Sequence, residues 1–556
     1  MSGTDAAIGK GYAAYKQGDL KAARVILSPI NHPQAWHILG LLERRAGRLD
    51  AALEWLEKAA DADPQNPEIP NNQGRAALDA GQGAQAETFF RRALKLRPDW
   101  APALSGLGRS LNDQKKWQDA DTVWCKLLAT GATDTGARYG AAMAALELGR
   151  VEQAEAAYTD MLNAGDRDVA IYFMRGRARL ELSQIESGMA DLNTAWAERP
   201  EPHVLKNLAN TLWMSGDVAG FNRLLASVPE DLSIMAVDLL AQSGDLEAAL
   251  DAWQGLPETH QADPHAMAVK SVILRDLGRA ADSLIAAEDA YTRRPDDPFM
   301  VDAVACARLM VGDGKGALAA IAPWRRAKPD SQHWLAYEAT ALRVMADPRY
   351  DALVRVDEHV RAYDLPVPEG FETIASFNDA FTEALEPVRG FTTHPLDQSL
   401  RMGAQTSRDL VGAPDPVIQA YIKALDAPIR AYIADIGTSP DHPTTARNTG
   451  NYRFNGCWSV KLGSGGRHVN HIHSEGWISS AYYASVPEET RRGDSKAGWI
   501  KFGEPPFKTT PETPPQRWIQ PEAGLLVLFP SFLWHGTDAI SEGVTRVTAP
   551  FDVVPA

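Results

Sequence analysis

A spacing of 34 residues between equivalent small and large side chains is the feature that most constrains the fold of this chain. Glycine, alanine, bulky apolar and proline residues recur at this interval, at several positions of the unit at once. The equivalent positions are Gly40, Gly74 and Gly108; Gly47 and Gly81; Ala52, Ala86 and Ala120; Leu56, Phe90 and Trp124; Ala59 and Ala93; Pro64 and Pro98. A fixed period of this length is typical of stacked supersecondary units that bury their apolar faces on one another. The sequence therefore predicts an array of helical repeats.

The residue types within the unit indicate a pair of helices. Small side chains suit the places where two helices approach closely, and large ones such as Leu56 and Phe90 fill the space between repeats. Proline at 64 and 98 ends the second helix, because it lacks an amide donor and clashes with the preceding turn. A 34-residue helical unit of this kind is that of the tetratricopeptide repeat. We expect about ten such repeats over residues 1–345, with the weakest matches near 201–240.

Length and charge limit what the chain does. With 556 residues the chain is too long for one hydrophobic core, so we expect more than one folding unit. Its 72 acidic residues exceed its 56 basic residues, for a net charge of −16, and no Lys/Arg-rich run interrupts that excess. Clustered positive charge is what phosphate groups require, so neither nucleic acid nor an anionic membrane is an expected partner.

The start of the chain and its cysteines bear on the compartment. No basic and apolar leader is visible at the start, and no apolar run reaches the length of a spanning helix. The three cysteines, at 125, 306 and 457, are far apart, which indicates free thiols in a reducing compartment. We therefore expect a cytoplasmic protein without a membrane span.

The 34-residue repeat pattern ends near residue 345. Residues 346–390 are mixed and contain a Pro/Gly-rich break at 364–370, so we interpret them as a linker or helical bridge. Residues 414–436 have helical periodicity. Short β-rich runs follow at 458–462, 477–483, 499–502, 525–529 and 545–551. Short strands separated by turn residues favour a sandwich or jelly roll over residues 391–556.

Three histidines in this region have the spacing of a metal site. His471 and His473 form an H-x-H pair, and residues two apart in a strand point to the same face. His535 follows at a distance, and Arg546 and Thr548 follow His535. Neutral imidazole suits iron, zinc and copper, and the guanidinium fork of arginine suits a carboxylate.

Several blocks of sequence between about 390 and 556 resemble the bacterial 2-oxoglutarate/Fe(II) oxygenases that carry N-terminal tetratricopeptide repeats. The blocks lie at 394–401, 405–406, 471–480, 498–503, 528–531, 534–537 and 546–548. The resemblance implies a double-stranded β-helix (jelly roll) with flanking helices, Fe(II) as the metal and 2-oxoglutarate as cosubstrate. It also implies that Arg546 and Thr548 hold the far carboxylate of 2-oxoglutarate.

Two sets of metal ligands remain open. The superfamily has a carboxylate two residues after its first histidine, where this chain has His473. Either His471, His473 and His535 bind the metal, or His473, Glu475 and His535 restore a facial triad of two histidines and a carboxylate. Other candidates for the pocket are Arg401, Gln405, Arg453, Ser479 and Trp534.

The leading functional hypothesis is an Fe(II)/2-oxoglutarate-dependent dioxygenase. Stacked helix pairs form a concave groove suited to extended peptides, so we expect it to hydroxylate a peptide or protein that this groove presents. One alternative is a scaffold whose oxygenase region has lost catalysis, which the missing carboxylate at position 473 motivates. Another is a different histidine-ligated metalloenzyme, such as a zinc hydrolase.

Overall fold

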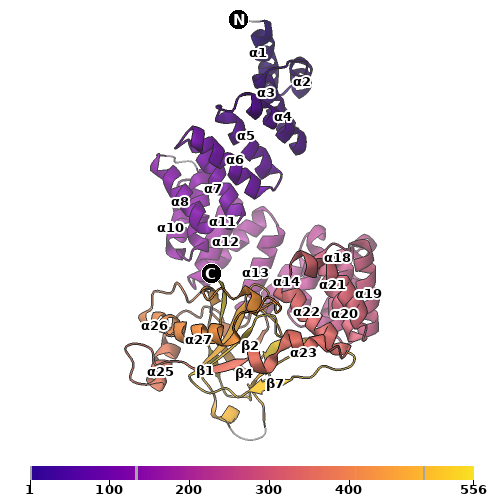
Figure 1. Cartoon of the computed structure of the whole chain (residues 1–556), viewed down its shortest axis with the longest axis vertical. Coiled ribbons are helices and arrows are strands. Elements are labelled where there is room, and N and C mark those ends of the chain that lie inside the picture. Colours follow the sequence, from indigo (N-terminus) through magenta and orange to yellow (C-terminus); the bar gives the residue numbers. More distant parts are fainter. Residues whose placement is uncertain (1–2, 132–134, 407, 492–494) are drawn as a thin grey trace. The chain divides into compact units, whose positions relative to one another are not determined.

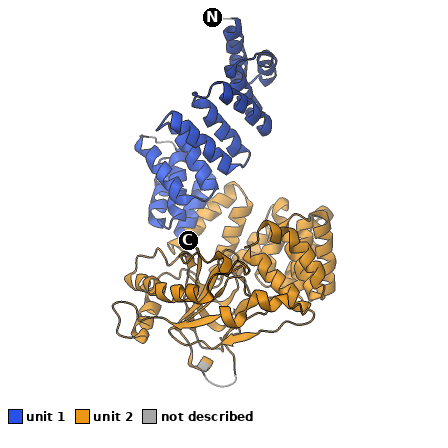
Figure 2. Ribbon diagram, in the orientation of Figure 1, with its two compact units in different colours: residues 1–179 blue, residues 180–556 orange. Residues whose placement is uncertain are grey.

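The computed structural model describes residues 3–131, 135–406, 408–491 and 495–556 of the chain. It divides into two compact units, residues 1–179 and 180–556 (Figure 2). The first unit is helical throughout the part that is described. The second unit combines further helices with antiparallel β-sheets. The helical N-terminal region and the β-rich C-terminal region agree with the predicted fold class at this level.

Consecutive helices of the first unit form hairpins (Figure 1). Their bounds are α1 Gly3–Lys16, α2 Leu20–Leu27, α3 Pro33–Arg45, α4 Leu49–Ala62, α5 Glu68–Asp79, α6 Gly83–Leu96, α7 Ala101–Asp113, α8 Trp117–Ala129, α9 Thr135–Glu147, α10 Val151–Asn163 and α11 Val169–Glu181. The repeated glycines lie where helices cross. A Cβ atom on Gly74 or Gly106 would come within 2.7 Å or 2.3 Å of the Phe90 ring, which is fully buried. The 34-residue period therefore reflects pairs of a small and a large residue that let neighbouring helices pack closely.

The second unit begins with the same kind of hairpins. Its helices before the sheets are α12 Ile185–Glu198, α13 Pro202–Met214, α14 Val218–Ala226, η1 Glu230–Leu232, α15 Ser233–Gln242, α16 Leu246–Gln254, α17 Glu258–Gln261, α18 Pro264–Asp276, α19 Ala280–Arg293, α20 Pro298–Met310, α21 Gly314–Ala327, α22 Gln332–Val344, α23 Arg349–Val354 and α24 Val356–His359. A Gly-Asp dipeptide joins several pairs. At Gly244-Asp245 the glycine has φ of 93° and the aspartate accepts a hydrogen bond from the amide of Ala248, so this short sequence both turns the chain and caps the next helix.

The β-rich region contains two antiparallel sheets, with three more helices. The strands are β1 Arg361–Asp364, β2 Leu400–Gln405, β3 Tyr452–Cys457, β4 Val460–His468, β5 Ile478–Ser485, β6 Ile500–Phe502, β7 Arg517–Ile519, β8 Leu525–Pro530, β9 His535–Thr537, β10 Arg546–Thr548 and β11 Phe551–Pro555. The larger sheet has the order β1-β8-β5-β10-β4-β2, with β11 paired to both β3 and β5. The smaller sheet has the order β7-β6-β9.

Three helices, α25 Ile374–Leu385, α26 Pro416–Ala424 and α27 Asp426–Ile436, share an apolar cluster with the larger sheet. The region also contains the 3-10 turns η2 Thr445–Arg447 and η3 Glu488–Arg491. Phe381, Tyr421 and Tyr482 stack between α25, α26 and β5, and all three are fully buried. The predicted bridge at 346–390 supplies both α25 and β1, and β1 pairs with β8 at the edge of the sheet.

The last repeat helix, α22, packs directly on the β-rich region within the second unit. The indole Nε1 of Trp534 donates to Thr340 Oγ1 at 2.9 Å, and Arg343 donates to the carbonyl oxygens of Gly503 and Pro514 at 2.8 and 2.6 Å. Trp534 and Phe507 also share an apolar cluster with Tyr337. Among the described residues, no helix is both long and apolar enough to span a bilayer.

Candidate metal centre

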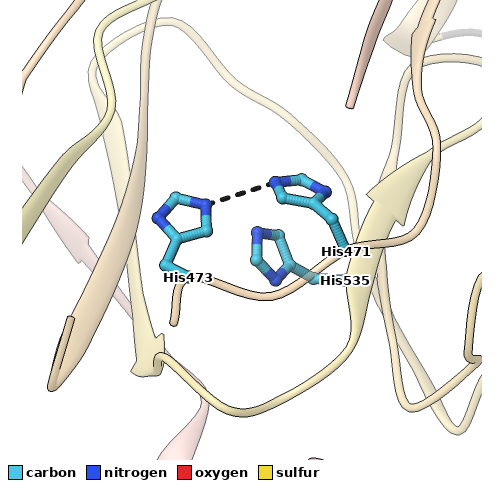
Figure 3. A group of neighbouring side chains, drawn as sticks. All are labelled: His471, His473 and His535. Carbon is cyan, nitrogen blue, oxygen red and sulfur yellow. Dashed lines mark hydrogen bonds between the residues drawn. The ribbon is translucent and has the colours of Figure 1, made fainter. Parts of the chain in front are cut away.

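Three histidines from two distant segments meet at the end of the smaller sheet (Figure 3). His535 is the first residue of β9, and His471 pairs with it through two backbone hydrogen bonds, His471 N to His535 O at 2.8 Å and the reverse at 3.0 Å. The H-x-H pair was expected to lie within a strand. It lies instead just beyond β4, where His471 forms an isolated bridge, and the chain then turns so that His473 N donates to Ser531 O. One ring nitrogen of each histidine lies within 4.8 Å of the others.

The hydrogen bonds at Nδ1 determine which nitrogen of each ring is free. Nδ1 of His471 lies 2.9 Å from the carbonyl oxygen of Val469, and Nδ1 of His535 lies 2.9 Å from that of Leu533. A carbonyl oxygen only accepts, so Nδ1 carries the proton in both rings. Nδ1 of His473 lies 2.7 Å from both carboxylate oxygens of Asp552, which likewise accept. Nδ1 is thus engaged in all three rings, which leaves Nε2 as the nitrogen that a metal ion would bind, and the Nε2 atoms of His471 and His473 lie 3.2 Å apart (Figure 3).

Burial keeps two of these rings, His471 and His535, neutral. Burial, and to a smaller extent the neighbouring His473, lowers the pKa of His471 to about 3. Burial also lowers the pKa of His535 well below its usual range, with added effects from His471 and His473. Neutral imidazole is the form that binds metal, so at neutral pH both side chains are ready to act as ligands.

A cavity of about 370 Å³ opens beside the three histidines and has a cationic wall. Arg546 and Thr548 of β10 line it, as do Tyr483 and Gln405. Arg546 is 2% exposed, and its Nη1 donates to the carbonyl oxygen of Gly498 at 2.5 Å. Burial lowers the pKa of its guanidinium, and the adjacent Tyr483 opposes that shift.

Two buried polar groups of this wall lack protein partners. Within the described residues, Arg546 Nε and the Tyr483 hydroxyl have no hydrogen-bond partner, and no carboxylate pairs with the guanidinium. Burial raises the pKa of Tyr483 to about 12, so its hydroxyl remains a donor. A buried, unpaired arginine is costly unless an anion satisfies it, so this wall fits a carboxylate ligand.

The other predicted residues occupy different places. Glu475 lines the cavity but is exposed and lies outside the group of close ligand atoms. Ser479 is buried beneath the site and donates to Asp552 Oδ1 at 2.7 Å. Arg453 is exposed on β3. Trp534 points toward the repeat helix α22, and Arg401 lines a second cavity rather than this one.

Sequence reasoning missed three residues of the site, of which Tyr483 of the cationic wall is one. Asp552 of β11 binds His473, and its place 79 residues later in the chain gave no local signal. His468, the last residue of β4, lines the cavity, and its ring stacks on that of His471 at 5.9 Å between centroids. His468 lies three residues before His471, so its closeness to the H-x-H pair could have indicated it from the sequence.

Models of known protein families match both the helical repeat region and the β-rich region. A family model described as "Putative 2OG-Fe(II) oxygenase" matches residues 456–552, which include the three histidines, Arg546, Thr548 and Asp552. Three models described as "Tetratricopeptide repeat" match residues 43–111, 135–158 and 234–298.

Individual proteins similar to this chain match its repeats. The cytochrome c-type biogenesis protein CycH of Bradyrhizobium diazoefficiens is 31% identical over 104 residues, which are 18% of this chain and 28% of that protein. The chain thus spans little more than a quarter of this relative. A tetratricopeptide repeat protein from Parabacteroides merdae is 16% identical with a TM-score of 0.32, over 55% of this chain and 98% of that structure. MamA from Desulfovibrio magneticus is 20% identical with a TM-score of 0.29, over 30% and 95% respectively. The family models thus match tetratricopeptide repeats in the N-terminal region, and residues 456–552 match the family described as "Putative 2OG-Fe(II) oxygenase".

Proposed function

We propose that this protein is an Fe(II)/2-oxoglutarate-dependent dioxygenase that hydroxylates a peptide or protein. The observation that carries the proposal is the meeting of three imidazoles, whose ligand nitrogens lie within 4.8 Å of one another, beside a buried arginine without a carboxylate partner in the described residues. A hydrolase would have use for the histidines but none for the arginine. We further propose that the antiparallel sheets form the double-stranded β-helix expected for this family, with the site between them.

In this proposal His471, His473 and His535 hold the iron. The ligand atoms of these three lie together, whereas Glu475 is exposed. Asp552 accepts a hydrogen bond from Nδ1–H of His473 and so makes that ring more basic and fixes its orientation. In a facial triad a carboxylate binds the metal directly. Here the carboxylate of Asp552 would act on the metal through the His473 imidazole, to which it is hydrogen-bonded.

The cationic wall would orient the cosubstrate. Arg546 and Tyr483, each with a buried donor that has no protein partner, line the cavity together with Thr548. Together they would hold the far carboxylate of 2-oxoglutarate and leave its keto acid end at the histidines. Fe(II), 2-oxoglutarate and O₂ supply the oxidation of a C–H bond, with succinate and CO₂ as co-products. The protein contributes the binding and the orientation of these groups.

The substrate is proposed from the repeats. Helical hairpins of this type build a concave surface that suits an extended chain, and in the second unit they pack against the region that holds the histidines. The cytoplasm is the proposed compartment, in keeping with Cys125, Cys306 and Cys457, which are all free thiols.

Binding of 2-oxoglutarate to protein loaded with Mn(II) in place of iron tests this proposal. Calorimetry should show one site in the wild type. Arg546→Gln should weaken 2-oxoglutarate about tenfold or more while Mn(II) affinity stays within about twofold, because a charged hydrogen bond to a carboxylate contributes about 1.5–3 kcal/mol. In air with Fe(II), the wild type should release succinate slowly even without substrate. Folded protein that binds the metal but neither binds nor consumes 2-oxoglutarate would contradict the proposal and favour the scaffold or hydrolase alternative.

A further inference from the structure

A second and larger cavity, of about 1040 Å³, lies within the second unit. Repeat helices α15, α18 and α20 form one side of it, and β2, β4 and residues 506–512 form the other. Asp397 and Gln398 line both this cavity and the one beside the histidines. The two spaces therefore meet at this pair of residues.

Two arginines stand directly opposite each other on the wall of this second cavity. Arg401 of β2 and Arg467 of β4 are register partners in the antiparallel ladder. Like charges placed opposite each other across two strands destabilise the ladder. Within the described residues neither arginine pairs with a carboxylate, and Arg401 Nη1 donates only to the carbonyl oxygens of Gln398 and Leu400, at 2.5 and 2.7 Å. Such a pair is explained if an anion binds between the two guanidinium groups.

The β2–β4 ribbon separates the two cavities. Leu400 and His468, the next register pair, line the cavity beside the metal centre. Arg401 and Arg467 line the opposite cavity, because successive residues of a strand point to opposite faces. A ligand held by the arginines would thus lie behind the wall of the metal site and reach the histidines around its end, at Gln398.

Most acidic residues of this cavity are held by neighbouring side chains. Asp276 lies 2.6 Å from Arg275, Asp302 lies 2.7 Å from His333, and Asp397 lies 3.0 Å from Lys206. Asp238 accepts a hydrogen bond from Gln242, and burial raises the pKa of its carboxyl group. Glu512, at the exposed rim, is the remaining acid of this lining. Arg401 and Arg467, by contrast, have no carboxylate partner within the described residues.

The repeats hold the far wall of the cavity in place. Thr510 donates from its amide to Leu309 O at 3.2 Å and from its hydroxyl to Met310 O at 2.7 Å, both in α20. Phe507, three residues earlier, packs on Tyr337 of α22. These contacts fix residues 506–512 against the helices, so the cavity is a built feature of the second unit.

We propose that this cavity binds an acidic segment of the polypeptide substrate, with its carboxylates held between Arg401 and Arg467. The inference rests on the proposed oxygenase function in one respect: a substrate residue next to the bound acidic segment would reach the histidines past Gln398, where the two cavities meet. The volume is far more than a single small anion fills.

Fluorescence anisotropy with a labelled peptide of twelve residues, rich in Asp and Glu, tests the proposal on the full chain. The comparison peptide replaces each acid with its amide. We expect the acidic peptide to bind about tenfold more tightly or better, and this difference should shrink between 50 and 300 mM salt, because each carboxylate–arginine contact is screened. Arg467→Glu should lose that preference, and the milder Arg467→Gln should reduce it. Arg326→Glu, an exposed arginine of α21 outside both cavities, is the matched control and should bind as the wild type does.

Three results would overturn the proposal: equal affinity for the acidic and amide peptides, unchanged affinity in Arg467→Glu that melts at the wild-type temperature, or tighter binding of a twelve-nucleotide RNA than of the acidic peptide. The titration needs neither iron nor 2-oxoglutarate. Acidic-peptide binding without any succinate formation would therefore count against the oxygenase function alone, and succinate formation without peptide discrimination would count against this proposal alone.

Discussion

Replacing Asp552 with asparagine should weaken metal binding without unfolding the protein. Both carboxylate oxygens lie 2.7 Å from His473 Nδ1, so they keep the proton on that nitrogen and leave Nε2 free. An amide of the same shape can present its NH₂ group instead, and it carries no negative charge. His473 would then spend time as the other tautomer, with a proton on the nitrogen that must bind the metal.

The size of the effect follows from this geometry. Loss of a carboxylate behind a ligating histidine lowers metal affinity about 10–100-fold, which is about 1.4–2.7 kcal/mol. Ser479→Ala removes only one hydroxyl donor to Asp552, a neutral-to-charged bond in the same network, and should lower the affinity by a smaller factor. Asp435→Asn is the control. This exposed carboxylate of α27 contacts Arg361 and Tyr363, so the variant should bind the metal as the wild type does.

Anaerobic calorimetry with Fe(II), together with the melting temperature of each variant, measures this. The account predicts the order wild type, Ser479→Ala, Asp552→Asn, from tightest to weakest. The reasoning would be refuted by an Asp552→Asn protein that melts as the wild type does and binds Fe(II) within about twofold of it, because His473 would then not depend on the carboxylate.

Two further predictions concern the second unit. Trp534→Phe keeps most of the buried ring but loses the bond to Thr340, so the free energy of unfolding should fall by about 1 kcal/mol or more, measured in urea. Thr340→Val should then lower the free energy of unfolding less in the Trp534→Phe protein than in the wild type, because the bond between the two residues is already lost. His359 and His442 are buried edge to face, with ring centroids 4.6 Å apart. Burial, and then His442, lowers the pKa of His359 to about 4, below its unfolded value near 6.5. The free energy of unfolding should therefore fall as pH drops from about 6.5 to 4. In a His359→Phe protein that still folds, this free energy should depend less steeply on pH, and an unchanged dependence would contradict the role given to His359.

The sequence predicted the helical repeats well because their signal is local and periodic. Gly74 and Phe90 are in contact because each repeat supplies the same small and large residues at the same positions. His471, His473 and His535 could be grouped in advance because the spacing matched a known pattern, and the structure brings their ring nitrogens together. The identity of the true ligands stays a prediction until a metal is bound.

What could not be predicted depends on register and on long-range contacts. A break in the β2–β4 pairing falls between Arg401 and Gly403, and the pairing places Arg401 on the face opposite Leu400, so this candidate for the metal pocket lines the second cavity instead. No local pattern reveals such a register. Asp552 reaches His473 only because β11 pairs with β5 beside the histidines. The orientation of Trp534 toward α22 likewise depends on how the repeats pack on the sheets.

The most direct test of the account is an anaerobic titration of the metal-free protein with Fe(II) and then 2-oxoglutarate, followed through the weak visible charge-transfer band of the complex. The account predicts a band in the wild type and in Glu475→Ala, and its loss in His535→Ala and Arg546→Ala. A band that disappears in Glu475→Ala but survives in His471→Ala would contradict the three-histidine centre and establish the facial triad, and no band in any protein, with no iron retained, would contradict the oxygenase function itself.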